Sequence, residues 1–129
     1  MGNPDPSRPT DAELAILRVL WRRGPSTVRQ AHEALSRDRE TGYTTVLKLM
    51  QIMNEKGLVE RDETERTHVY RTRLTQEQTQ QQLVNDLLEK AFGGSASQLA
   101  LQALAAKPAT ADEMAQIRRL LDELEGGKQ

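Results

Sequence analysis

The sequence contains no cysteine and no long apolar run. Without cysteine, the 129-residue chain can form no disulfide, no thiolate metal site and no cysteine nucleophile. No apolar stretch approaches the ~20 residues that a membrane-spanning helix needs, and Met1–Thr10 is too polar for a signal peptide. We therefore expect a soluble, cytoplasmic protein with no membrane partner.

Aromatic residues are also scarce. They make up 3% of the chain, against 36% for all hydrophobic residues, while Leu, Ala, Glu, Gln and Arg are plentiful. This composition favours helices packed by aliphatic side chains over a β-sandwich or barrel. We predict a mainly α protein, built as one medium domain or as a small domain with an appendage.

An excess of positive charge is lacking as well. The net charge is −1, but residues 1–75 carry +2 and residues 76–129 carry −3. This asymmetry is weaker than the basic footprint of many DNA-binding domains. Charge alone thus permits a nucleic-acid partner for the first half without requiring one.

The clearest functional pattern lies in Tyr43–Val59. Its apolar residues recur at helical spacing and form one stripe of a helix of about three turns: Val46, Leu49, Met50 and Met53. The opposite face is polar and holds no acid before the last turn. Gly57 ends the helix, and a β-branched, apolar run begins directly after it. A recognition helix followed by a wing is the natural interpretation.

Two shorter helices precede this stretch. Thr10 and Glu13 have the spacing of a capping box, which starts a helix at about Asp11 that ends before Gly24. Ser26 or Thr27 can cap a second helix that reaches about Ser36. On the first helix we expect Trp21 to anchor the core, although it could instead serve as a stacking platform for a base.

A hairpin is predicted after the recognition helix. The segments 58–61 and 68–71 alternate apolar with polar residues on either side of a polar turn. Three helices and then a two-stranded wing is the order of a winged helix-turn-helix. Arg66, near the tip, would contact DNA or form an ion pair with Glu63 or Glu65, and the sequence leaves both open.

Residues 75–125 predict a second, helical domain that begins with another capping box at Thr75. Its apolar positions are assigned to dimerisation: Leu87, Leu88, Phe92, Leu99, Met114, Ile117, Leu121 and Leu124. Three such short helices cannot bury their stripes alone, so a second copy of the chain is the economical partner. The alternative is a monomer in which they fold back on the first domain. The predicted order is a flexible arm (1–9), a winged-helix DNA-binding domain (10–74), this dimerisation domain (75–125) and a tail (126–129).

No catalytic constellation is present. His32 and His68 lie on different predicted elements, without a paired carboxylate, serine or Gly-rich phosphate loop at usable spacing. We predict that the protein is not an enzyme and holds no metal or cofactor. A winged helix that binds only other proteins is the main alternative to a DNA-binding function.

An ordered set of motifs carries a family resemblance: Thr-Asp-Ala-Glu at 10–13, Leu20-Trp21, Tyr43-Thr44-Thr45-Val46 and Lys56-Gly57-Leu58-Val59. Over roughly Pro9 to Leu124 the chain resembles the penicillinase repressor family, the bacterial BlaI/MecI/CopY transcription regulators. The resemblance implies a homodimeric winged-helix repressor that binds a palindromic operator. It also implies that the repressor is released from DNA when a membrane receptor-protease senses a cell-wall antibiotic. The implied DNA contacts are Tyr43, Thr44, Thr45, Lys48 and Arg66.

The chain departs from the family pattern in three places. On the recognition helix, Leu47 stands where a polar or basic residue is often found, and Gln51-Ile52-Met53 differs from the usual polar-Arg-Leu, so no operator sequence can be transferred. The family's cleavable Asn-Phe bond should fall near Gln102-Ala103, where neither residue is present. The copper-responsive branch ends in a Cys-rich motif, and the absence of cysteine argues against copper sensing.

Overall fold

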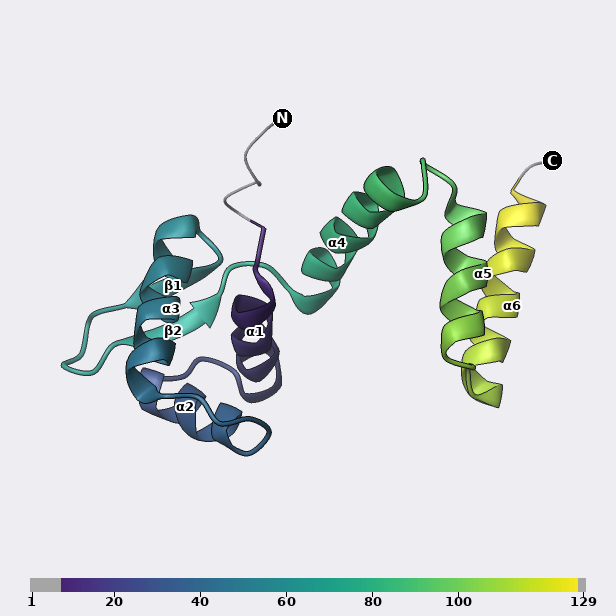
Figure 1. The fold of residues 1–129 in the computed structure, drawn as a ribbon. Helices are drawn as coiled ribbons and strands as arrows, with labels where there is room; N and C mark the ends of the chain where they lie inside the picture. The colour runs from purple at the N-terminus through teal and green to yellow at the C-terminus, as the bar shows by residue number, and fades with distance from the viewer. Residues whose placement is uncertain (1–7, 128–129) are drawn as a thin grey trace. The chain divides into compact units, whose positions relative to one another are not determined.

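The computed structural model describes residues 8–127, which form six helices and one two-stranded hairpin (Figure 1). In chain order these are α1 (Asp11–Arg23), α2 (Val28–Ser36), α3 (Tyr43–Lys56), β1 (Val59–Asp62), β2 (Val69–Thr72), α4 (Gln76–Ala91), α5 (Ala96–Ala106) and α6 (Ala111–Gly126). The predicted arm, 1–9, lies outside the described residues except for Arg8 and Pro9. The predicted tail, 126–129, lies outside them except for Gly126 and Gly127. The chain divides into two compact units after Gln81, inside α4.

Local capping sets where the helices begin. The Thr10 hydroxyl accepts the Glu13 N–H at 3.2 Å, and the Glu13 carboxylate accepts the Thr10 N–H at 2.9 Å. The same reciprocal pairs form at Thr27 and Gln30, at Thr75 and Gln78, and at Thr110 and Glu113. Each pair satisfies donors that a helix start otherwise leaves free. Of the two candidates for capping α2, Thr27 is therefore the N-cap.

The core of the first unit lies where α1, α2 and α3 pack on one another and on the hairpin. Its buried hydrophobic residues are Ile16, Leu17, Val19, Leu20, Val28, Ala31, Ala34, Leu35, Val46, Met50, Met53, Leu58, Val59 and Tyr70. The predicted stripe of α3 is confirmed, since Val46, Met50 and Met53 are fully buried and Leu49 packs against them. Burial of these aliphatic side chains is the main force holding the three helices together.

Trp21 fixes the end of the wing to α1. It packs against the core, and its indole Nε1–H donates to the Leu74 carbonyl oxygen at 3.1 Å. A ring held in this way is not free to stack on a base. The predicted core role of Trp21 is thus confirmed.

The hairpin is antiparallel, with Val59 opposite Thr72 and Asp62 opposite Val69. Ser26, between α1 and α2, pairs with Tyr70 of β2 in a single antiparallel β-bridge, which the sequence did not reveal. Its N–H donates to the Tyr70 carbonyl at 2.9 Å, and the Tyr70 N–H donates back at 2.8 Å. The fold class is confirmed as a mainly α, α+β winged helix.

A buried ion pair joins the beginning of α1 to the end of α3. Lys56 Nζ lies 2.6 Å from Glu13 Oε1, and the Glu13 side chain is only 3% exposed. Lys56 also donates to the Arg8 carbonyl at 3.2 Å. Because these residues are 43 positions apart, the pair fixes the angle between the two helices rather than either helix alone.

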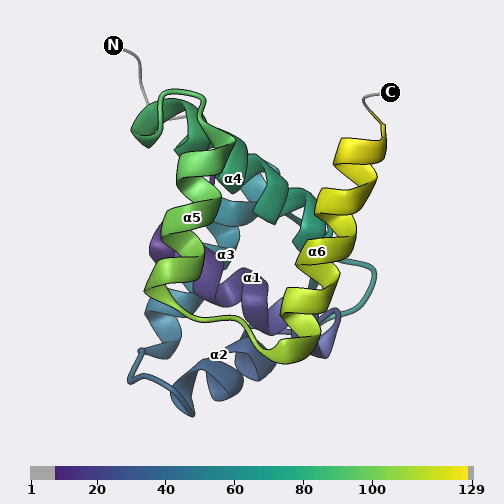
Figure 2. The same cartoon turned by 90° about the vertical axis from the view of Figure 1, so that its right-hand side faces the viewer.

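The second unit contains the end of α4 and the helices α5 and α6. Gly93 and Gly94 both have positive φ and break the chain after α4. Ser95 then caps α5 by accepting the Gln98 N–H. From their connection at 107–110, α5 and α6 run in opposite directions and stand apart in Figure 2. Within residues 82–127 no side chain is fully buried.

Candidate nucleic-acid interface

The exposed face of α3 carries four of the five predicted DNA-contacting residues. Tyr43, Thr44, Thr45 and Lys48 are all exposed in the first half of the helix. The first turn holds no acid, and the only acid of the helix is Glu55, near its end. Hydroxyls and an ammonium without a neighbouring carboxylate are suited to phosphates and to base edges.

An open groove of ≈ 380 Å³ lies between α3, the start of α2 and the hairpin. Its lining is Thr27, Val28, Arg29, Tyr43, Leu47, Gln51, Arg61, Arg66, Thr67, His68 and Tyr70. The groove thus brings Tyr43 together with Arg66. Thr44, Thr45 and Lys48 lie outside this lining, on the same helix.

The groove is cationic. Three arginines and one histidine line it, and the described residues contribute no carboxylate to the lining. Clustered arginines at the side of an exposed helix are the electrostatic footprint of a phosphate-binding surface. The net charge of the whole chain, −1, gave no indication of this local excess of positive charge.

Sequence reasoning missed several residues of the groove, above all Arg29 and Gln51. Arg29 lies in the first turn of α2, directly after the capping box of Thr27. Gln51 follows Tyr43 by eight positions on α3, so both side chains fall on the helix face that lines the groove. This spacing was a usable signal for Gln51, whereas Arg29 reaches the groove only through the packing of α2.

The ion pairs of the wing differ from those considered for Arg66. Glu63 lies 3.3 Å from Arg61 and 3.8 Å from His68. Within the described part of the chain, no ion pair involves Arg66. The Tyr70 hydroxyl, followed by Glu63, raises the pKa of the Arg61 guanidinium above its ordinary value. Glu63 thus partly offsets Arg61 and lies near the His68 ring, while Arg66 has no ion pair within the described residues.

The turn of the wing is fixed by Asp62. Its carboxylate accepts the Thr64 N–H at 2.9 Å and the Thr64 hydroxyl at 2.7 Å. These two bonds lower the pKa of Asp62 below its ordinary value. The turn therefore holds its shape with Asp62 ionised, and Arg66 follows directly in the same connection.

None of the residues assigned to dimerisation is fully buried in the second unit. Leu87, Leu121 and Leu124 are 46%, 50% and 57% exposed. The remaining five, Leu88, Phe92, Leu99, Met114 and Ile117, are half-buried. Leu101, which the sequence reasoning passed over, is 65% exposed.

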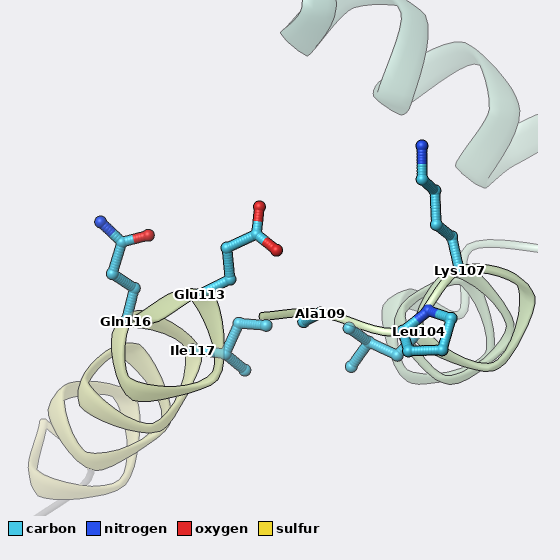
Figure 3. A pocket seen from close by; sticks show the side chains of 7 residues that line it. Leu104, Lys107, Ala109, Glu113, Gln116 and Ile117 are labelled. Carbon is cyan, nitrogen blue, oxygen red and sulfur yellow. The ribbon is translucent and has the colours of Figure 1, made fainter. Parts of the chain in front are cut away.

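A pocket of ≈ 490 Å³ lies at the connection of α5 and α6. In Figure 3, Leu104 of α5 and Ile117 of α6 turn toward each other with Ala109 between them. Lys107 and Glu113 stand at its edge. The apolar side chains that line it, Leu104, Ala109 and Ile117, are only half-buried.

Other kinds of site find no support in residues 8–127. That part of the chain holds no group of three or more His, Asp or Glu side chains placed to bind a metal ion. Within the same residues, every helix is too short or too polar to cross a membrane.

A unit of three helices with a two-stranded wing and a cationic groove beside α3 defines a winged-helix protein. The penicillinase repressor family matches residues 9–123 of the chain. Two relatives, each called transcriptional regulator BlaI and each from a strain of Mycobacterium tuberculosis, are 38% identical over 118 residues. The alignments cover 91% of this chain and 85% of each relative. The chain belongs to the penicillinase repressor family, whose members regulate transcription and are not enzymes.

Proposed function

We propose that this protein is a DNA-binding transcriptional repressor. The observation that carries the proposal is the carboxylate-free, arginine-lined groove beside the exposed start of α3. In this arrangement α3 enters the major groove of DNA, where Thr44, Thr45 and Lys48 meet bases and phosphates. Arg66 and Arg29 line the groove beside the helix and bind the phosphate backbone there. Because this partner is chromosomal DNA, the protein acts in the cytoplasm.

We further propose that the second unit joins two copies of the chain. Leucines that are 46–65% exposed, together with helices that stand apart, give a surface a single copy leaves open. Large exposed apolar patches of this kind mark interaction surfaces. A two-fold pair would bury the exposed leucines of both copies against each other. It would also present two α3 helices to one side of the DNA. The operator is then a palindrome with half-sites about one helical turn, or ~34 Å, apart.

The genes under control are proposed to serve a response to β-lactams or cell-wall stress, because the family is named for the repression of penicillinase. A sensor protease is not part of the proposal. Gln102 and Ala103, near which the family's cleavage bond should fall, lie inside α5. A bond in a helix is poorly presented to a protease, which prefers exposed loops.

The test is binding of the purified protein to DNA from the region upstream of its own gene, with unrelated DNA as competitor. We expect preference for the upstream fragment and a log–log salt slope of about −0.9 for each phosphate neutralised. Thr45→Ala and Lys48→Ala should weaken binding, with unfolding temperature and oligomeric state unchanged. Glu55→Gln, at the far end of α3, is the matched control and should retain affinity.

Three results would contradict the proposal. Equal affinity for upstream and unrelated DNA would mean that α3 does not read sequence. Absence of any salt-sensitive DNA binding would favour a winged helix used for protein interaction only. Dissociation of either α3 variant into monomers would mean that this helix belongs to the dimer contact instead.

A further inference from the structure

His32 connects α2 to the start of α3. Its ring Nε2 lies 2.7 Å from the Thr41 carbonyl oxygen. A carbonyl can only accept, so this ring nitrogen carries the hydrogen and donates it. The ring is half-buried and meets the Tyr43 ring edge to face, with centroids 5.7 Å apart and planes at 79°. His32 therefore contacts Thr41 and Tyr43, the residues on either side of Gly42.

The start of α3 has little else to hold it. Gly42 is its N-cap and provides no side-chain hydrogen bond, whereas a Thr or Ser side chain caps each of the other helices in residues 8–127. The preceding connection, 37–42, is polar and largely exposed. Its first residues are tied to Leu35 through the Asp38 and Arg39 N–H groups. Thr41 lies beyond these ties, and His32 makes the side-chain bond that reaches it.

The position of Tyr43 matters because its ring lines the cationic groove. Tyr43 is 43% exposed, so packing against the core restricts it only in part. The edge-to-face contact with His32 is a second constraint on its direction. A displacement of this ring would alter the groove and the adjoining Thr44 and Thr45 together.

We infer that His32 is a positioning residue for DNA recognition, which orders the uncapped start of α3 and directs Tyr43 into the groove. The inference rests on the proposed DNA-binding function. His32 touches no DNA itself in this arrangement; it acts through the Thr41 carbonyl and the Tyr43 ring. A role of this kind predicts linked changes in three quantities: amide exchange at the start of α3, affinity for DNA, and the energetic coupling of His32 to Tyr43.

The experiment compares His32→Ala with His32→Gln, whose amide N–H can still donate to Thr41. In the free protein, amide exchange at residues 46–49, the first α3 amides with a hydrogen bond inside the helix, should accelerate in His32→Ala and remain near the wild-type rate in His32→Gln. Affinity for the upstream DNA fragment should fall about tenfold in His32→Ala, the combined effect of one hydrogen bond and one ring contact. His32→Gln should recover most of that loss. The salt slope should not change, because no phosphate contact is removed.

A double-mutant cycle with Tyr43→Ala completes the test. If His32 acts through Tyr43, the double variant loses less affinity than the two single losses combined. Independent, additive losses would overturn this part of the inference. A salt slope that falls by about one unit in His32→Ala would indicate direct phosphate contact and overturn it as well.

Exchange in the free protein separates the inference from the proposed function. If the wild type binds no DNA but exchange still accelerates at residues 46–49 in His32→Ala alone, then the proposed function fails and His32 still orders α3. Unchanged exchange in His32→Ala would overturn the inference whatever the DNA result. Faster exchange across the whole first unit in both variants would assign His32 a general structural role and also overturn it.

Discussion

At the residue scale, the candidate site is defined by where individual charges are left without a partner. The groove gathers arginines from three segments of the chain, and Glu63 offsets only Arg61 and His68. Arg66 remains free of ion pairs within the described residues, so a phosphate meets no internal competitor there. Exposed ion pairs on their own contribute little stability, so these charges can be changed without unfolding the domain.

Arg66→Ala should weaken DNA binding and reduce the salt slope by about one unit, because one phosphate contact is lost. Arg73→Ala is the matched control, since Arg73 is an exposed wing arginine that lies outside the groove lining and faces Glu60 at 3.7 Å. The measurement is fluorescence anisotropy with labelled upstream DNA over a salt series. Equal losses in both variants would mean that the wing contributes only diffuse charge.

The turn of the wing should depend on pH through Asp62. Its folded pKa is lowered below the ordinary 3.8, so the stabilisation is present above that value and is lost as pH falls through the lowered pKa. The Thr64 amide resonance should therefore be constant at neutral pH and shift only below about pH 3.8. In Asp62→Asn this transition should be absent. A Thr64 shift that persists in Asp62→Asn would mean that another group causes it.

At the element scale, α3 must end sharply so that the chain can turn into β1. Gly57 makes this turn with φ +83°, a left-handed conformation that side chains disfavour. A Cβ at this position would also lie 3.2 Å from an Arg73 guanidinium nitrogen. The position of the whole hairpin relative to α3 therefore depends on this glycine.

Gly57→Ala should destabilise the first unit by about 1–2 kcal/mol. Gly42→Ala provides the control, since Gly42 has φ −72° and a Cβ there would meet only Thr45 Oγ1 at 3.9 Å. The control should retain full stability. Thermal unfolding followed by the fluorescence of Trp21, the chain's one tryptophan, reports on this unit directly. Equal stability of both variants would mean that the turn can adopt another conformation at no cost.

At the scale of the whole molecule, two units carry two kinds of surface. The first buries a continuous core and exposes a cationic groove, while the second buries no residue within 82–127 and exposes leucines. A small helical unit gains too little from burial to be stable alone. The proposed assembly through the second unit would cover the exposed leucines and bring two copies of α3 together.

Leu121→Asp should convert the dimer into monomers, because it places a charge within an apolar contact surface. Operator affinity should fall with it, since the two α3 helices no longer bind as a pair. Gln82→Asp adds the same charge at an exposed polar position of α4 and should remain dimeric. Light scattering at several protein concentrations measures the oligomeric state. A Leu121→Asp protein that stays dimeric would place the contact elsewhere.

The sequence by itself determined the elements and their order. Capping boxes such as Thr10 with Glu13 act over three residues, and the stripe of Val46, Met50 and Met53 repeats within one helix, so both can be read locally. These features were sufficient to predict the winged-helix fold, and the ordered motifs, such as Tyr43-Thr44-Thr45-Val46, were sufficient to predict the family.

Only the tertiary structure decided which distant residues meet. The bond from His32 to Thr41, the bridge from Ser26 to Tyr70 and the pair of Glu13 with Lys56 join separate elements. Arg29 reaches the groove in the same way, from the first turn of α2. Such contacts depend on the angles at which helices pack, and those angles are set by the whole core rather than by the spacing of residues along one element.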